Sequence, residues 1–278
     1  MTEHRKNKEF VDGLARGLSV IEAFDVEHAE MTLAEVARRT SLTAATARRS
    51  LHTLEQLGYV RCVNKRYLLA PKILALGSAY MRVAHVEDAL LPELRRIIQK
   101  FGDAASVAVL TGRDILYVAH WSEQGGVRPI AGTGVTYPAY ATSMGRVLLS
   151  GLPPEQLDRY LDEVPLRKLT DVTETDPDRL RAIIQGVRQA GHAVVVDQLA
   201  YGVTALAVPI MLSDNRTVAA VNTSGYSGRV TPQSLVHERL TDLRACAGRL
   251  SEALLRYPAL RHSIEFEVSH FGNTAPAG

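Results

Sequence analysis

The chain has 278 residues, of which 46% are hydrophobic and 22% are charged, a composition typical of folded globular proteins and not of disordered or fibrous ones. No apolar stretch reaches the roughly 18–20 residues that span a bilayer, and the charged N-terminus lacks the apolar segment of a signal peptide, so a cytoplasmic protein is expected. Its 32 Lys and Arg residues nearly balance 30 Asp and Glu residues, and the net charge of +2 argues by itself against a polyanionic partner. Cys62 and Cys246 lie outside any Cys-x-x-Cys or Cys/His cluster, which excludes a disulfide framework and a zinc site as expectations.

The charges are distributed unevenly along the chain. Residues 1–72 carry a net charge of +3 and residues 73–278 a net charge of −1. Within residues 38–72, eight Lys and Arg side chains stand against a single acid, Glu55, so this segment carries +7. Such a cluster is either a solvated face or a contact surface for a polyanion, and the elements around it decide between the two.

Two short helices are predicted near the N-terminus. Apolar residues in the segment 13–25 recur at spacings of three and four, which is typical of an amphipathic helix. They are Leu14, Leu18, Ile21 and either Ala23 or Phe24. Thr32 and Glu35 then form a capping-box pattern, in which hydroxyl and carboxylate satisfy free amides at a helix start, and this helix is expected to end near Thr40.

A third helix is expected from Thr43 to Leu57, after a tight turn at Ser41 and Leu42. One face of this helix is formed by Ala47, Leu51, Leu54 and Gly58. The opposite face carries Ala45, Arg49, His52 and Gln56, with Arg48 beside them. The first face is suited to a core, and the second face is suited to a groove of DNA.

A basic hairpin is predicted after the third helix. The runs 59–63 and 67–69 are typical of short strands, and Asn64, Lys65 and Arg66 form a polar turn between them. Two helices, a turn, a third helix and a basic hairpin are the elements of a winged helix-turn-helix, whose third helix enters the major groove. Double-stranded DNA is therefore the expected partner, and the candidate contact residues are Arg16, Thr32, Thr43, Ala45, Thr46, Arg48, Arg49, His52, Lys65 and Arg66.

The remainder of the chain predicts a mixture of strands and helices. Helices are expected over 72–85 and 88–101, from Thr175 as the capping residue to Gly191, and from Thr231 to Tyr257. Strands are predicted at 105–110, 115–120, 193–196, 204–212 and 218–223, with turns at 111–114 and 213–216. This order indicates an α+β fold with a mostly antiparallel sheet covered by helices.

The predicted domain organisation has five parts. They are a flexible tail at 1–12, a winged helix-turn-helix domain at 13–71, a linker helix at 72–87, a second domain at 88–260 and a flexible tail at 261–278.

A candidate carboxylate site lies where the segment 137–146 leads into an apolar helical run at 147–149. If that helix starts near Thr142 or Ser143, its first free amides and its positive dipole end could hold a carboxylate. The alternative is that Thr142 or Ser143 is only an N-cap. Asn222 and Ser224 alternate along a predicted strand and therefore point to one sheet face, where they could reach one ligand together.

Enzymatic chemistry is not expected. The sequence 141–145 approximates a Gly-x-Ser-x-Gly nucleophile elbow, but its first Gly is missing and Tyr137-Pro138 is a poor strand to precede it. Gly132 and Gly134 have no third Gly with which to form a dinucleotide fingerprint. The nine histidines include no group with metal-ligand spacing, so no metal, cofactor or catalytic residue is expected.

These residues also resemble a known family. GLARGLSVIEAF, MTLAEVARRTSLTAATARRSLHTLEQLGYV and KRYLLAPKILALGSAYM, all within residues 13–81, are similar to the DNA-binding half of IclR-type transcriptional regulators. TYPAYATSMGRVLLSGLP, TDPDRLRAIIQGVRQAGHAVVVDQ and VAAVNTSGYSGRVT extend the resemblance over nearly the whole chain. The variants PAYATSMGR and AAVNTS are most similar to the branch that controls protocatechuate, 4-hydroxybenzoate and β-ketoadipate breakdown.

The resemblance implies a GAF-like effector-binding domain that holds a small organic acid against the helix start at 142–143. It implies an opposite wall formed by the strand with Asn222 and Ser224 and by the strand with Ala205. The acidic stretch that many relatives have before Gly202 is shortened here to VVDQLAYG, so Asp197 is its remaining acidic candidate. Trp121 either stacks on a ligand ring or belongs to the core or an interface. The candidate effector-binding residues are Trp121, Tyr137, Thr142, Ser143, Met144, Gly145, Asp197, Ala205, Asn222 and Ser224.

The expected function is that of a ligand-responsive transcriptional regulator of aromatic-acid catabolism genes. Its effector is expected to be a small aromatic or ring-cleavage carboxylic acid. A homodimer or a tetramer is expected to bind a pseudo-palindromic operator. The alternatives are regulation of another carbon-source pathway and a C-terminal domain that serves mainly in oligomerisation.

Overall fold

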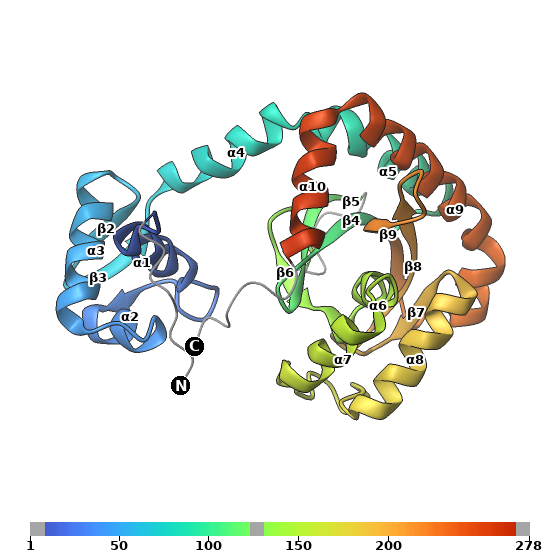
Figure 1. The fold of residues 1–278 in the computed structure, drawn as a ribbon, viewed down its shortest axis with the longest axis horizontal. Coiled ribbons are helices and arrows are strands. Elements are labelled where there is room, and N and C mark those ends of the chain that lie inside the picture. Colours follow the sequence, from blue (N-terminus) through green and yellow to red (C-terminus); the bar gives the residue numbers. More distant parts are fainter. Residues whose placement is uncertain (1–8, 123–130, 271–278) are drawn as a thin grey trace. The chain divides into compact units, whose positions relative to one another are not determined.

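The computed structural model describes residues 9–122 and 131–270. Its contacts divide the chain into two compact units, one within Met1–Tyr80 and one within Met81–Ala275, and each is described by itself (Figure 1). None of the described helices is both long and apolar enough to cross a membrane.

The N-terminal unit is a winged helix-turn-helix. Its elements are α1 (Asp12–Glu22), β1 (Met31–Thr32), α2 (Leu33–Arg39), α3 (Ala44–Gln56), β2 (Val60–Val63) and β3 (Arg66–Leu69). The three strands form an antiparallel sheet in the order β1-β3-β2. Strand β1 was not predicted, because two residues are too few to show a period. The core lies where α1, α2, α3 and β2 meet, and Val20, Val36, Ala47, Leu51 and Val60 are buried there.

Local sequence signals fix the ends of these elements. Thr32 and Glu35 form the predicted capping box at the start of α2. Asn64 and Lys65, between β2 and β3, both have positive φ, as the tightest hairpin turns require. Gly58, which the helical period had placed on α3, lies beyond the helix end with a φ of +80°. Its freedom at positive φ turns the chain from α3 into the wing.

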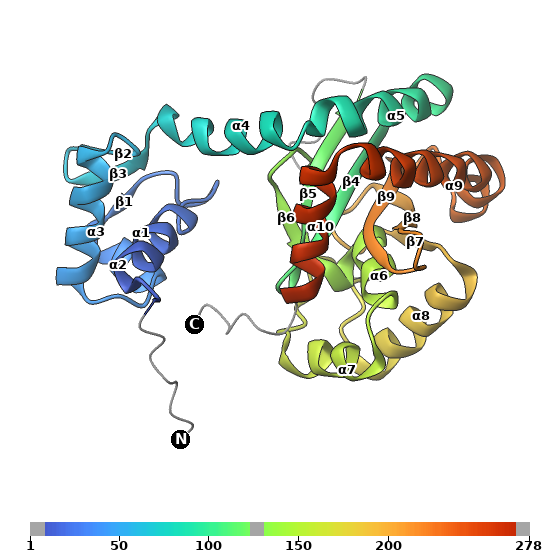
Figure 2. The same ribbon diagram turned by 45° about the horizontal axis from the view of Figure 1, so that its top comes forward.

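The C-terminal unit contains one six-stranded sheet with helices on both faces (Figure 1, Figure 2). The strand order is β6-β5-β4-β9-β8-β7, and every neighbouring pair is antiparallel. The strands are β4 (Ala104–Thr111), β5 (Asp114–Ser122), β6 (Thr136–Pro138), β7 (Ala193–Val196), β8 (Val203–Met211) and β9 (Thr217–Tyr226). The expectation that Tyr137-Pro138 makes a poor strand was wrong, because both residues belong to β6. Pro138 is tolerated because β6 is an edge strand.

Helices cover both faces of the sheet, and the sheet separates two apolar layers. One layer lies under α5 (Val86–Phe101), α9 (Pro232–Arg256) and α10 (Pro258–His270). The other lies under α6 (Ser143–Ser150), α7 (Pro154–Glu163) and α8 (Pro177–Ala190). Two single-turn helices, η1 (Pro71–Ile73) and η2 (Ala139–Ala141), precede α4 (Leu74–Val83) and α6.

Three predicted boundaries need correction. The linker helix expected over 72–87 is interrupted, because α4 ends at Val83 and His85 has a φ of +53°, so residues 86 and 87 begin α5. The N-cap of α8 is Asp176 and not Thr175, because the Asp176 carboxylate accepts the Arg179 N–H. The N-terminal tail expected over 1–12 falls mostly outside the described residues, and α1 already begins at Asp12.

The flexible tail expected over 261–278 was also wrong in its first part. Helix α10 extends through this region, and Leu260 and Ile264 are buried in the core. Pro258 begins this helix, because proline is well tolerated in the first turn of a helix. Residues 271–278 lie outside the described residues.

Gly145 is required by the packing of α6 against the preceding turn. A Cβ atom at Gly145 would lie 2.1 Å from the Ala139 carbonyl oxygen. We expect Gly145→Ala to lower the free energy of unfolding by about 3 kcal/mol, because backbone atoms must move apart. The measurement is chemical unfolding followed by the fluorescence of Trp121, the only tryptophan of the chain, which lies in the C-terminal unit.

Gly248→Ala is the matched control. Gly248 is an exposed glycine within α9, with no atom within 4 Å of its Cβ position. Alanine there should stabilise the helix by up to about 1 kcal/mol. Equal unfolding midpoints for the two variants would contradict the close approach at Gly145.

Candidate functional site

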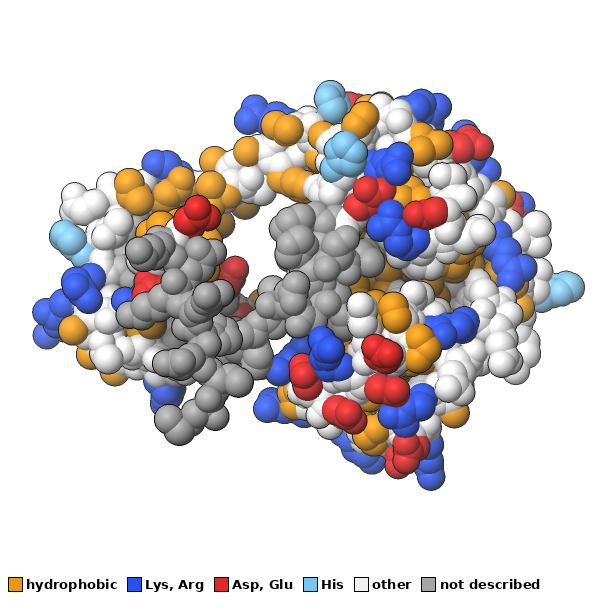
Figure 3. All heavy atoms as spheres, in the orientation of Figure 1, with side chains coloured by type: hydrophobic (Ala, Val, Ile, Leu, Met, Phe, Trp, Pro, Cys, Tyr) orange, Lys and Arg blue, Asp and Glu red, His pale blue; other side chains and the backbone are white. Residues whose placement is uncertain are grey.

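The outward face of α3 is the candidate DNA-reading surface. Ala45, Arg48, Arg49 and His52 are all exposed, and Lys and Arg side chains gather over α3 in Figure 3. No hydrogen bond or ion pair joins the side chains of Arg48, Arg49 or His52 to other described residues. These groups are therefore free to contact an external partner.

Thr43 and Thr46 build the start of α3. Thr43 is the N-cap, and its Oγ1 accepts a hydrogen bond from the Thr46 N–H at 3.2 Å. The two hydroxyl oxygens lie 2.9 Å apart. Both side chains thus hold the first turn of the helix in place, and the positive end of its dipole lies beside them.

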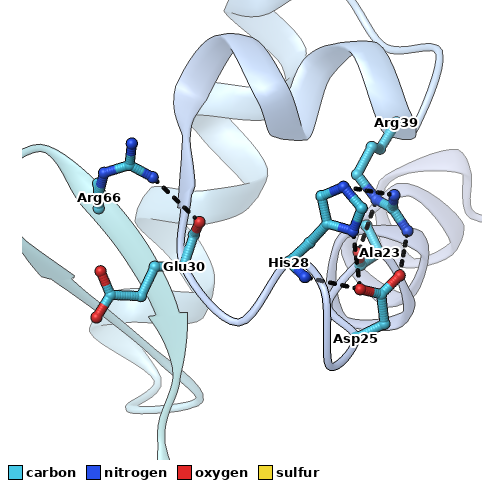
Figure 4. Close-up of polar contacts among 6 residues, drawn as sticks. All are labelled: Ala23, Asp25, His28, Glu30, Arg39 and Arg66. Atoms are coloured by element: carbon cyan, nitrogen blue, oxygen red, sulfur yellow. Dashed lines mark hydrogen bonds and ion pairs between the residues drawn. The ribbon is translucent and has the colours of Figure 1, made fainter.

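Part of the basic segment is neutralised inside the N-terminal unit (Figure 4). Arg39 donates from Nη2 to Asp25 Oδ2 at 2.6 Å and from Nε to the Ala23 carbonyl at 3.0 Å. Its Nη1 lies 3.2 Å from His28 Nε2. Lys72 donates to the Leu57 carbonyl at 2.8 Å. Both cations join segments of the fold, but only Arg39 is paired with an acid, Asp25, so the charge offered to a partner is smaller than the segment total of +7.

Besides Thr43 and Thr46, three of the predicted DNA contacts have partners within the protein. Arg16 lies 3.3 Å from Asp12 on the exposed side of α1. The Thr32 hydroxyl accepts from the Glu35 N–H at 3.3 Å and donates to Glu35 Oε2 at 2.9 Å. Arg66 donates to the Glu30 carbonyl at 3.3 Å (Figure 4) and lies 3.8 Å from Glu35. Hydrogen bonds from the Thr32 N–H and hydroxyl hold the pKa of Glu35 below its usual value. Lys65, at the wing tip, is exposed and has no partner among the described residues.

A cavity of about 490 Å³ lies in the C-terminal unit between the sheet and the start of α6. This volume is within the range of small-molecule sites. Seven of the ten predicted effector residues line it, namely Tyr137, Thr142, Ser143, Met144, Ala205, Asn222 and Ser224. Asn222 and Ser224 share one face of β9, as their alternation predicted.

The start of α6 presents unpaired amide groups at this cavity. Thr142 is the N-cap, and its Oγ1 accepts the Gly145 N–H at 3.0 Å. The N–H groups of Ser143 and Met144 have no hydrogen-bond partner among the described residues, although both residues are buried. Thr142 is therefore an N-cap, as the alternative held, but two amide donors and the positive end of the helix dipole remain for a ligand.

Trp121 does not line the cavity. Its ring packs on the opposite face of the sheet, with the Arg95 guanidinium 4.2 Å from the ring centroid. The cause is a bulge in β5, where Ala119 pairs with Val107 and Tyr117 with Ala108, so Val118 is an extra residue. The bulge reverses the alternation that would have placed Trp121 on the side of Tyr117. The core alternative for Trp121 is the one the structure supports.

Gly145 and Asp197 are also absent from the cavity wall. The Gly145 N–H is bonded to Thr142, and its backbone packs on Ala139. The Asp197 Oδ1 accepts hydrogen bonds from the Val203 N–H at 3.0 Å and from Ser227 Oγ at 2.8 Å. Asp197 thus closes the turn before β8, and the altered 195–202 segment uses it for structure.

Tyr117 and His120 line the cavity but were missed by sequence reasoning. The Tyr117 ring meets the Tyr137 ring edge-on, with centroids 5.5 Å apart and planes at 82°. Burial raises the pKa of both phenols, so both remain hydrogen-bond donors. His120 Nδ1 lies 2.9 Å from Ser106 Oγ, and burial lowers the pKa of His120, which favours the neutral imidazole. No local signal could have revealed these residues, because the bulge alone brings 117 and 120 to one face.

Comparison with known families matches both units of the chain. The model described as "Bacterial transcriptional regulator IclR C-terminal" matches residues 78–252, and the model described as "IclR helix-turn-helix domain" matches residues 13–63. The chain is 38% identical over 247 residues to a Pca regulon regulatory protein of Pseudomonas putida, a match that covers 88% of this chain and 85% of that protein.

Two further matches involve aromatic acids by name. A p-hydroxybenzoate hydroxylase transcriptional activator of Acinetobacter baylyi is 31% identical over 254 residues, which cover 90% of this chain and 94% of that protein. The crystal structure of an IclR homolog complexed with 4-hydroxybenzoate, from Microbacterium hydrocarbonoxydans, is 25% identical with a TM-score of 0.68 and covers 90% of this chain and 99% of that chain. The chain belongs to the IclR family of bacterial transcriptional regulators, and it is a regulator and not an enzyme.

Proposed function

We propose that this protein senses a small aromatic or ring-cleavage carboxylic acid in the cavity beside α6 and controls genes for aromatic-acid breakdown. The observation that carries the proposal is that the amide groups of Ser143 and Met144, two buried residues, have no partner in the part of the chain that the structure describes. A carboxylate there would accept two hydrogen bonds and interact with the positive end of the helix dipole. Tyr117 and Tyr137 offer ring faces and edges to an aromatic ligand.

The relatives support the same ligand class. One is named for the Pca regulon, one for p-hydroxybenzoate hydroxylase, and one structure is described as a complex with 4-hydroxybenzoate. Seven cavity residues agree with those that the family resemblance suggested as effector contacts. Trp121, Gly145 and Asp197 are left out of the proposed contacts because none of them lines the cavity.

DNA contact is proposed for α3 and the wing. Arg48, Arg49 and His52 would meet base edges, since they are exposed on one helix face and are not paired with any described residue. Thr43, Ala45 and Thr46 would lie at the same end of the groove. Lys65 would contact the phosphate backbone, and Arg16, Thr32 and Arg66 could do so only after exchanging their present partners.

A homodimer on a pseudo-palindromic operator is proposed, acting in the cytoplasm. A single module of this size contacts only one half-site. Large apolar side chains are exposed along α1 and α4, and Figure 3 shows such side chains over α4. On α1 and just before it they are Phe10, Val11, Leu14 and Leu18, and on α4 they are Leu74, Leu76, Tyr80 and Val83. Burial of these surfaces against a second copy would remove them from water.

Regulation requires that the effector bind two states of the protein with different affinity. Helix α4 is the only covalent path from the N-terminal unit to the effector cavity, so a change in α5 and its sheet would reach the DNA-binding unit through it. We propose that the ligand shifts the population of dimers whose DNA-binding units fit the operator.

The reading role of α3 is tested with Arg49→Ala. Operator affinity should fall by about 1–3 kcal/mol, and selectivity should relax at one base position, if Arg49 contacts a base. Lys65→Ala should instead weaken binding to all sequences alike and reduce the salt dependence by about one phosphate contact. Fluorescence anisotropy with labelled operator at several salt concentrations measures both effects. The same titrations should give a stoichiometry of two chains per operator.

Arg159→Ala is the control for loss of one positive charge. Arg159 lies exposed on α7 in the C-terminal unit. Its removal should leave operator affinity unchanged. An Arg49→Ala protein that binds as the wild type does would remove Arg49 from the reading surface.

The carboxylate site is tested by removing one amide donor with Ser143→Pro. Proline is favoured at the first position of a helix and has no N–H, and the extended conformation of Thr142 is compatible with a following proline. The loss of a hydrogen bond to a charged group should weaken binding of the effector about 10-fold or more. Calorimetry with 4-hydroxybenzoate, protocatechuate and β-ketoadipate provides the measurement.

Ser143→Ala is the matched control, because it removes the hydroxyl and keeps the amide. It should bind the effector more tightly than Ser143→Pro. Equal binding by the wild type and both variants would place the carboxylate elsewhere. If none of the three acids binds the wild type, the proposed ligand class is wrong.

A further inference from the structure

The cavity wall also carries the carboxylate of Asp103, which lies outside α6. Asp103 lies in the turn between α5 and β4, and it lines the cavity with Ala104 and Ser224. Ser143 and Met144, at the start of α6, line the same cavity, so a ligand that fills it would meet both groups.

The backbone at Asp103 is held in an unusual conformation. Gly102 and Asp103 have successive positive φ values of 69° and 63°. A non-glycine residue rarely adopts this region, although Asp and Asn do so more readily than most. Such conformations persist where the surrounding structure enforces them. Here they direct the Asp103 side chain toward β9.

Arg239, on α9, fixes one oxygen of this carboxylate. Its Nη2 lies 3.2 Å from Asp103 Oδ2, its Nη1 donates to Thr223 Oγ1 at 3.0 Å, and its guanidinium lies 5.2 Å from the Phe101 ring centroid. The side chain of Arg239 is 6% exposed and that of Asp103 is 25% exposed. The Arg239 guanidinium pairs with the Asp103 carboxylate and points it in one direction.

Gly225 makes room for the carboxylate. A Cβ atom at Gly225 would lie 2.9 Å from Asp103 Oδ2. Glycine inside a strand often marks such a close approach. The second oxygen, Oδ1, has no hydrogen-bond partner among the residues that the structure describes. A carboxylate oxygen accepts hydrogen bonds, so this oxygen is available to a donor on a ligand in the cavity.

We infer that Asp103 is a specificity-determining residue that accepts a hydrogen bond from a hydroxyl group of the effector. This inference rests on the proposed function, in which the effector carboxylate lies at Ser143 and Met144. The effector class is then a hydroxy-substituted aromatic monocarboxylic acid. A second carboxylate at this position is disfavoured, because it offers no donor and carries the same charge as Asp103.

Arg229 is the competing group in this cavity. It lines the cavity, is exposed, and forms no ion pair among the described residues. A cation at that position would attract a second carboxylate. Solvent screens an exposed cation more than the half-buried Asp103, so the hydroxyl acceptor should decide which ligands bind.

The test is calorimetry of the full-length protein with three probes of one scaffold. They are 4-hydroxybenzoate, benzoate, which lacks the hydroxyl, and terephthalate, which has a carboxylate in its place. The wild type should bind 4-hydroxybenzoate about 10- to 100-fold more tightly than benzoate, as expected for a hydrogen bond to a charged acceptor, and terephthalate most weakly. In Asp103→Asn the preference for 4-hydroxybenzoate over terephthalate should fall at least about 10-fold, because the amide donates to a carboxylate.

The variant is chosen to preserve the fold. Asn tolerates positive φ and keeps an oxygen for Arg239. Asp242→Asn is the matched control, because Asp242 pairs with Lys100 at 2.8 Å and does not line the cavity. It should keep the wild-type preference, and Trp121 fluorescence checks that both variants fold. Terephthalate should bind weakly to Arg229→Gln, as it does to the wild type.

Three outcomes overturn the inference. The first is wild-type binding of terephthalate or benzoate that equals binding of 4-hydroxybenzoate. The second is an Asp103→Asn protein with the wild-type preference. Either result, with binding still sensitive to Ser143→Pro, leaves the proposed function intact. The third is no binding of any probe to the wild type, and it contradicts the proposed ligand class together with this inference.

Discussion

Two backbone N–H groups at the start of α6, those of Ser143 and Met144, have no partner among the described residues, and ligand binding by the C-terminal unit depends on them in this account. Both donors belong to residues that line the cavity, where a ligand acceptor can reach them. Thr142 satisfies only the third amide, and Gly145 lets the helix start pack directly on Ala139. The first turn is therefore rigid, and a carboxylate bound there gains hydrogen bonds without reordering the backbone.

The sheet gives this helix start a second wall and gives the cavity a direction. A bulge at Val118 turns Tyr117 and His120 to the cavity side and sends Trp121 into the opposite layer. In the turn between α5 and β4, Asp103 is held by Arg239, which also bonds Thr223, between the cavity residues Asn222 and Ser224. In the proposed complex, one group of the cavity would donate to a carboxylate and another would accept from a hydroxyl, so the chemistry of the ligand and its orientation would be selected together.

The features that sequence predicted are those with local causes. The capping box at Thr32, the helix start at Thr142 and the alternation of Asn222 with Ser224 depend on neighbouring residues alone. The features that sequence missed depend on distant partners or on an irregularity. The Asp25–Arg39 pair lowers the net charge that a count over residues 38–72 gives. Asp103 pairs with Arg239, which lies 136 residues away in the sequence. The bulge in β5 has no signature in composition.

The most direct test of the ligand site is NMR of the Met144 amide itself. The chain has five methionines, so selective 15N-methionine labelling gives a spectrum with few resonances. On titration with 4-hydroxybenzoate, the Met144 amide proton should shift downfield, as a new hydrogen bond to a carboxylate requires. Met211, at the end of β8 and outside the cavity wall, should change little. A Met144 resonance that stays in place while calorimetry detects binding would contradict the site.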